Sequence, residues 1–130
     1  MFLLDANAVI AVLKGHDRVL DRLRARSPQD IAISAIVAHE LYYGAYKGQR
    51  VVENLSRVDA LRFNVLEFDR DDARWAGEVR ATLASAGKPI GPHDVLIAGQ
   101  ALSRSLILVT RNTREFSRVD GLRIEDWEAA

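Results

Sequence analysis

Short apolar runs alternate with longer stretches of helical periodicity along the whole chain. Strand-like runs lie at residues 2–4, 30–33, 64–68, 106–109 and 122–124. Helical patterns occupy residues 6–13, 17–26, 35–47 and 50–62, the segment that follows the start signal at 69–72, and the segment from 92 onward. Strands that alternate with helices form parallel sheets covered by helices. The sequence therefore predicts an α/β fold, a three-layer α/β/α arrangement around a short, mainly parallel sheet.

The helix that begins at Pro92 is expected to be buried, because residues 95–102 are apolar on nearly every side. Asp94 falls in its first turn, where the positive end of the helix dipole stabilises a carboxylate. Ala98 and Ala101 are small and leave room above this acid. An acid in a first turn often only stabilises its helix, so Asp94 alone does not identify a site.

Two other patterns predict how helices begin and pack. Ser34 is a good N-cap for the helix over residues 35–47. Trp75, Val79 and Leu83 recur at four-residue steps and predict the inward face of their helix.

Composition limits the remaining possibilities. The 130 residues, 48% of them hydrophobic, are enough for one core, so we expect a single domain over residues 1–130. Lys plus Arg equals Asp plus Glu at 18 each, and charge therefore argues neither for nor against nucleic-acid binding. No apolar run reaches membrane-spanning length, and residues 1–5 lack the basic region of a signal peptide. We expect a cytoplasmic protein.

Four acids are candidates for a shared site, since ligands of parallel sheets bind at the carboxyl ends of the strands. Asp5 follows the first strand, and Glu115 follows the strand at 106–109 after a short loop. Glu40 lies on a largely apolar helical stripe, where an unpaired charge is costly. Asp94 completes the set. The plainer alternatives are a helix cap for Asp5 and, for Glu115, a solvated acid paired with a nearby arginine.

Four carboxylates at one edge would repel one another unless a cation held them together. The chain has no cysteine and three histidines, which leaves oxygen ligands and favours Mg²⁺, with Mn²⁺ as a substitute. Such a cluster can hydrolyse a phosphodiester through a metal-activated water. Neighbouring side chains could orient ligands or hold phosphates, and the candidates are Asn7, Thr110, Arg111, Asn112 and Arg114.

Four segments, in this order, resemble the PIN-domain ribonucleases and, among them, the VapC toxins of bacterial type II toxin-antitoxin modules. They are residues 4–7 (LDAN), 34–41 (SAIVAHEL), 89–94 (PIGPHD) and 109–116 (VTRNTREF). The resemblance implies a Mg²⁺-dependent endoribonuclease in which Asp5, Glu40 and Asp94 match the family's acidic triad. Glu115 stands where many members have Asp, which keeps the charge but lengthens the side chain.

The resemblance also implies a substrate and partners. Residues 111–116 and 121–127 resemble the VapC branch that cleaves tRNA anticodon loops, including that of initiator tRNA. A VapB-type antitoxin is expected to hold the toxin in check, and the chain is expected to form a homodimer, within a larger assembly with VapB. Tyr42, Tyr43 and Tyr46 lie beside Glu40 and are expected to form, with arginines of the next helix, the surface that receives the antitoxin tail.

Three other functions fit parts of the sequence. Haloacid-dehalogenase-like phosphatases also place an Asp after the first strand, but they need a second Asp where this chain has Asn7. His39 and His93 could serve a metal-free ribonuclease, although each is more simply a core or surface histidine. A degenerate PIN domain would only bind RNA or a partner, yet no acid of the set is missing.

Overall fold

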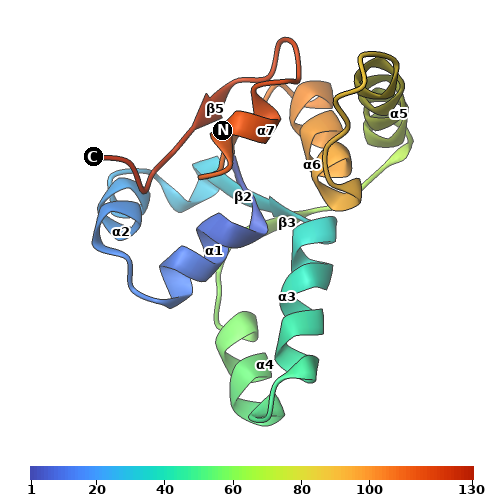
Figure 1. Ribbon diagram of the computed structural model, residues 1–130. Helices are drawn as coiled ribbons and strands as arrows, with labels where there is room; N and C mark the ends of the chain where they lie inside the picture. The colour runs from blue at the N-terminus through green and yellow to red at the C-terminus, as the bar shows by residue number, and fades with distance from the viewer.

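The computed structural model describes residues 1–130, and at its centre is a five-stranded sheet in the order β3-β2-β1-β4-β5 (Figure 1). The strands are β1 (Phe2–Leu4), β2 (Ile31–Ser34), β3 (Asn64–Leu66), β4 (Ile107–Val109) and β5 (Ile124–Glu125). Every neighbouring pair is parallel, which confirms the predicted fold class. Because β1 lies in the middle, it is hidden by both neighbouring strands and both helix layers, and Leu3 and Leu4 are fully buried.

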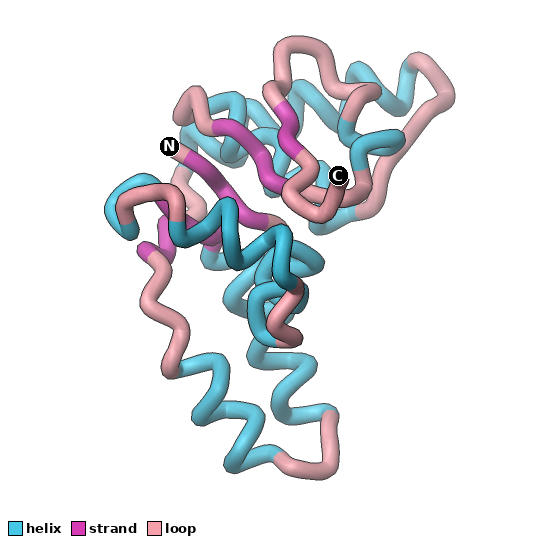
Figure 2. Tube along the Cα trace, turned by 90° about the vertical axis from the view of Figure 1, so that its left-hand side faces the viewer, coloured by secondary structure: helices cyan, strands magenta, loops and turns pink.

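Seven α-helices surround the sheet. They are α1 (Ala6–Leu13), α2 (Asp17–Arg24), α3 (Ala35–Lys47), α4 (Val51–Asp59), α5 (Arg70–Ser85), α6 (Pro92–Ser103) and α7 (Thr113–Phe116). Right-handed crossovers with this strand order place α1–α4 on one face and α5–α7 on the other. Figures 1 and 2 show α3 and α4 as a hairpin that projects away from the sheet.

Most differences from the sequence prediction lie at element ends. The second helix ends at Arg24 rather than 26, and α4 spans Val51–Asp59 rather than 50–62. The last strand begins at Ile124, two residues later than predicted. A short 3₁₀ turn at Pro28–Asp30 and the one-turn helix α7 were not predicted, because segments this short carry no periodicity.

The prediction for the inner face of α5 is wrong at Trp75. Val79 and Leu83 are buried, but Trp75 is 44% exposed, and the next residue, Ala76, takes the inward position. Four-residue steps drift around a helix of 3.6 residues per turn, so one turn of the stripe moves off the packed face. By contrast, Ser34 caps α3 as expected, since its Oγ accepts a hydrogen bond from the Ile36 amide at 3.0 Å.

Helix α6 is buried as predicted and packs closely on α5. Six of its residues are buried, including Ala98 and Ala101. Gly99 makes the closest approach, because a Cβ at this position would lie 2.4 Å from Cα of Ala76. Only a residue without a side chain fits here.

Replacing Gly99 by alanine should lower the free energy of unfolding by about 1 to 3 kcal/mol, since the methyl group forces α5 and α6 apart. Gly77→Ala is the matched control. Gly77 lies in α5 with open space at its Cβ position, so higher helix propensity should raise stability by up to about 1 kcal/mol. Urea unfolding of both variants measures the difference, and equal effects would show that the two helices separate without cost.

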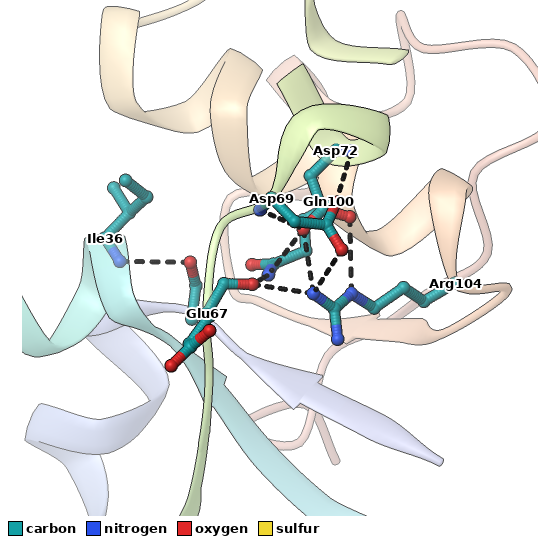
Figure 3. Close-up of polar contacts among 7 residues, drawn as sticks. Ile36, Glu67, Asp69, Asp72, Gln100 and Arg104 are labelled. Atoms are coloured by element: carbon teal, nitrogen blue, oxygen red, sulfur yellow. Dashed lines mark hydrogen bonds and ion pairs between the residues drawn. The ribbon is translucent and has the colours of Figure 1, made fainter. Parts of the chain in front are cut away.

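A buried ion pair joins the start of α5 to the end of α6 (Figure 3). Asp72 is fully buried, and its carboxylate accepts hydrogen bonds from Nε and Nη2 of Arg104 at 3.2 and 2.9 Å. The same carboxylate closes a capping box with Asp69. Arg104 and Gln100 also donate to the main-chain oxygen of Glu67, just after β3, at 2.6 and 3.0 Å. Burial acts to raise the pKa of Asp72, but the hydrogen bonds from Arg104 and Asp69 outweigh it and hold the pKa below its usual value.

None of these helices combines the length and apolar character that a bilayer crossing requires.

Candidate active site

Asp5 lies at the carboxyl end of the central strand. Its side chain is 4% exposed, and Oδ1 accepts a hydrogen bond from the Ala8 amide at 2.9 Å, so the predicted capping role is real. The Asp5 amide donates to the Val109 carbonyl at 3.1 Å, which ties the end of β1 to the end of β4. The strand order reverses direction between β1 and β4, and such switch points are where open α/β sheets bind ligands.

Burial raises the pKa of Asp5 to about 6. Hydrogen bonds from Thr110 and Ala8 lower it, and the charges of Asp94 and Glu40 raise it further. The surroundings of Asp5 therefore destabilise its ionised form. The nearby charges that act on it are both negative.

Asp94 reaches the same place from the first turn of α6. It is partly buried, and its Oδ2 would lie 3.1 Å from a Cβ at Gly91, so the carboxylate lies directly over that glycine. Its pKa is raised by burial and by the charges of Glu115 and Glu40, with a smaller opposing effect from His93.

Glu40 is the third acid and has a partner that sequence reasoning missed. Its Oε1 lies 2.7 Å from Nδ1 of His93, and Nδ1 donates because an ionised carboxylate only accepts hydrogen bonds. The His39 ring packs edge-on against His93. His93 precedes Asp94 in the sequence, and this adjacency to a candidate acid is the one signal that could have identified it.

Glu115 comes from α7, after the loop that follows β4. Its Oε2 accepts a hydrogen bond from Nδ2 of Asn112 at 3.2 Å, and the Asn112 amide donates to the Thr110 hydroxyl at 3.0 Å. Neither Arg111 nor Arg114 forms an ion pair with it, so the alternative of a simple arginine-paired acid is not what the structure contains.

The structure thus brings together the four acids predicted from the sequence. The charges of Asp94 and Glu40 raise the pKa of Asp5, and those of Glu115 and Glu40 raise the pKa of Asp94. No three of them already surround one point in the manner of a metal centre. Their donor set nevertheless fits a hard divalent cation, since it is all oxygen and includes the buried Asp5 without a cationic partner.

The predicted substrate-binding residues divide into two groups. Thr110 is buried against Asp5, and Asn112 holds Glu115, so both position acids. Asn7, Arg111 and Arg114 are exposed, and Asn7 and Arg111 line a common groove.

In the metal-free protein, Asp5 should make stability fall as pH rises. A folded-state pKa above the unfolded value means that the folded chain binds the extra proton between about pH 4 and 6, so stability is lost through that window. One pH unit of pKa difference is worth about 1.4 kcal/mol, so the loss at pH 7 is about 3 kcal/mol. The Asp5→Asn variant keeps a side chain that can cap α1 and should recover the stability lost at pH 7. Urea unfolding in chelator at pH 4.5 and pH 7 measures this, and a pH profile that is unchanged in the variant would contradict it.

Comparison with known proteins agrees with this geometry. The PIN domain family model matches residues 2–122. The tRNA(fMet)-specific endonuclease VapC of Shigella flexneri is 43% identical over 128 residues, covering 97% of both chains. Ribonuclease VapC2 of Haemophilus influenzae is 37% identical over 129 residues, again with 97% coverage of both. The crystal structure of DNA-bound VapBC from Salmonella typhimurium superposes with a TM-score of 0.92 at 42% identity, covering 97% of each chain.

The chain therefore belongs to the PIN-domain family, and its relatives place it among the VapC ribonucleases of toxin-antitoxin systems. The fold and class implied by the sequence resemblance are confirmed.

Proposed function

We propose that this ribonuclease cleaves tRNA with Mg²⁺ held by Asp5, Glu40, Asp94 and Glu115, and that it is a cytoplasmic toxin formed by a single domain over residues 1–130. The observation that carries the proposal is the meeting of four acids from four separate segments at the β1/β4 switch point. Mn²⁺ should substitute, because it accepts the same oxygen ligands.

The acids have different parts in this mechanism. When bound, the metal supplies an activated water for attack on phosphorus and stabilises the leaving oxygen. Asp5, the one fully buried acid of the four, and Asp94, in the first turn of α6, would hold the cation together with Glu40 and Glu115. His93 fixes the carboxylate of Glu40, and Asn112 fixes that of Glu115.

Exposed arginines would hold the substrate. Arg111 and Arg114 flank the segment that carries Asn112, and both have free guanidinium groups for phosphate oxygens. The tRNA assignment, with initiator tRNA as the first candidate, is supported by the tRNA(fMet)-specific relative.

The test is to incubate purified, antitoxin-free protein with total RNA, with and without Mg²⁺, and to map new 5′ ends. We expect Mg²⁺-dependent cuts at one position in the anticodon loop of few tRNAs, leaving 5′-phosphate and 3′-hydroxyl ends because the attacking group is water. Cyclic 2′,3′-phosphate ends formed in chelator would instead favour a histidine mechanism. Scattered cuts across all RNAs would contradict the tRNA assignment alone.

A VapB-type antitoxin is the proposed partner, supported by the VapBC complexes among the solved neighbours. A groove of about 280 Å³ runs between α1, α3 and α4 and has Glu40 in its wall. Apolar side chains such as Ile10 and Leu41 line it, and Arg57 of α4 lies there too. An antitoxin tail could occupy this groove and place a basic side chain against the acids.

The tyrosines expected to form this surface do not line the groove. Tyr43 and Tyr46 are more than 60% exposed and lie on the opposite side of α3, because residues 40, 41, 44 and 45 share the groove-facing side.

The homodimer is also part of the proposed function, and size-exclusion measurement of the antitoxin-free chain tests it. Co-expression with a small gene encoded immediately upstream or downstream of this one should give a complex that does not cleave tRNA. Co-purification without loss of cleavage would contradict the inhibitory role.

A further inference from the structure

A second groove lies along the outer side of α1, next to the acids. Its volume is about 330 Å³, and its polar wall consists of Asn7, Lys14, His16, Arg111 and Glu128, with only two apolar residues. The groove is thus formed by one face of α1, the loop after β4 and the C-terminal segment.

The groove leads away from the acids. Asn7 is two residues after Asp5, and Arg111 follows Thr110, whose hydroxyl hydrogen-bonds to Asp5. Lys14 lies seven residues beyond Asn7 on the same side of the helix, a distance of about 10 Å along its axis. An extended ligand that leaves the acid cluster at Arg111 can therefore follow this wall of the groove to Lys14.

The two strong cations of the groove have no partners. Neither Lys14 nor Arg111 forms an ion pair, whereas Arg104 and Arg26 are both paired with acids. At the far end, Nε2 of His16 lies 3.7 Å from Oε1 of Glu128, and Arg18 donates to the Glu128 main-chain oxygen at 3.2 Å. The anionic carboxylate is therefore held at the end of a cationic groove.

We propose that this groove binds the sugar-phosphate backbone of the RNA on one side of the scissile bond, with Lys14 and Arg111 each contacting a phosphate. This inference rests on the proposed nuclease function and adds Lys14, at the end farther from the acids, to the substrate-binding residues. RNA is favoured over an acidic peptide because the groove offers two separated cations and few apolar side chains to anchor a peptide. Glu128 repels the phosphates and lowers the affinity.

The test measures RNA binding in an Asp94→Asn background, so that cleavage does not interfere, with unfractionated bacterial tRNA as the probe. Lys14→Ala should weaken binding several-fold and reduce the slope of log K against log[salt] by about 0.7 to 0.9, the contribution of one phosphate contact. Lys14→Arg should restore most of the affinity. Glu128→Gln should tighten binding about two- to three-fold, an effect opposite in sign that a damaged fold cannot produce.

Matched controls come from α5, on the other face of the sheet. Arg80→Ala and Glu78→Gln make the same charge changes at exposed positions and should leave affinity and salt slope unchanged. Ethylation of the phosphates on one side of the scissile bond should interfere with RNA binding in the parent protein and in both controls. This interference should disappear in Lys14→Ala.

The outcomes separate this inference from the proposed function. Wild-type protein that neither binds nor cleaves RNA overturns both. If Lys14→Ala cleaves RNA normally and binds RNA with the same affinity as Arg80→Ala, the proposed RNA-binding role of the groove is overturned. The proposed nuclease function is then unaffected. Loss of antitoxin co-purification in Lys14→Ala, with RNA binding unchanged, assigns the groove to the protein partner and also overturns the proposal.

Discussion

Replacing Asp94 by asparagine is expected to reduce RNA cleavage by about 1000-fold or more, which corresponds to about 4 kcal/mol of transition-state stabilisation. Asparagine keeps the size of the side chain and one oxygen, but it removes the charge that we propose helps to hold the cation. The folded chain should not suffer. Burial and neighbouring acids already raise the pKa of Asp94, so the ionised group is destabilising in the absence of metal.

The measurement is the cleavage rate of a tRNA substrate with saturating Mg²⁺, together with the melting temperature in chelator. Asp120→Asn, which changes an exposed acid outside the cluster, is the control and should cleave normally. Cleavage within ten-fold of wild type in Asp94→Asn would remove this residue from the site. A lower melting temperature in chelator would show that its main role is in stability.

Replacing Arg104 by alanine is expected to destabilise the fold by about 3 to 5 kcal/mol. The change leaves the fully buried carboxylate of Asp72 without its ion pair, and the Glu67 carbonyl loses one of its two donors. Because the folded-state pKa of Asp72 is below its unfolded value, the stability from this pair is present above about pH 4 and is lost as pH falls further.

A double variant separates charge from packing. Asp72→Asn with Arg104→Met removes both charges and keeps an oxygen that can accept the Asp69 amide of the capping box, so most of the lost stability should return. Arg80→Ala on the same helix as Asp72 is the exposed control. Chemical unfolding at pH 7 compares them, and an Arg104→Ala variant that is as stable as Arg80→Ala would show that water replaces the pair without cost.

Features that depend on local sequence could be predicted. The apolar runs predicted all five strands to within one or two residues, and the parallel sheet follows from their alternation with helices. Once the sheet is parallel, an acid directly after a strand must lie at its carboxyl edge. That reasoning places Asp5 and leads to Glu115, and the buried start of α6 places Asp94.

Contacts between distant segments could not be predicted. The pair Glu40–His93 is separated by 53 residues and depends on where α3 and α6 meet at the sheet edge. The pair Asp72–Arg104 depends on the close approach of α5 and α6, which the helical patterns do not specify. A four-residue stripe predicts that a helix has an inner face but not its exact rotation, which is why Trp75 was misplaced.

The central position of β1 determines when the sheet can be completed during translation. The strand β1 precedes the other four in the chain but occupies the middle of the sheet, and its β4 edge stays open until residues 107–109 have been synthesised. A nascent chain that ends within α5 carries Asp5 and Glu40 but neither Asp94 nor Glu115. The proposed set of metal-binding acids is thus complete only once Glu115 has been synthesised. A host that makes this toxin is therefore protected until Glu115 has been synthesised, and the proposed antitoxin is needed only from that point.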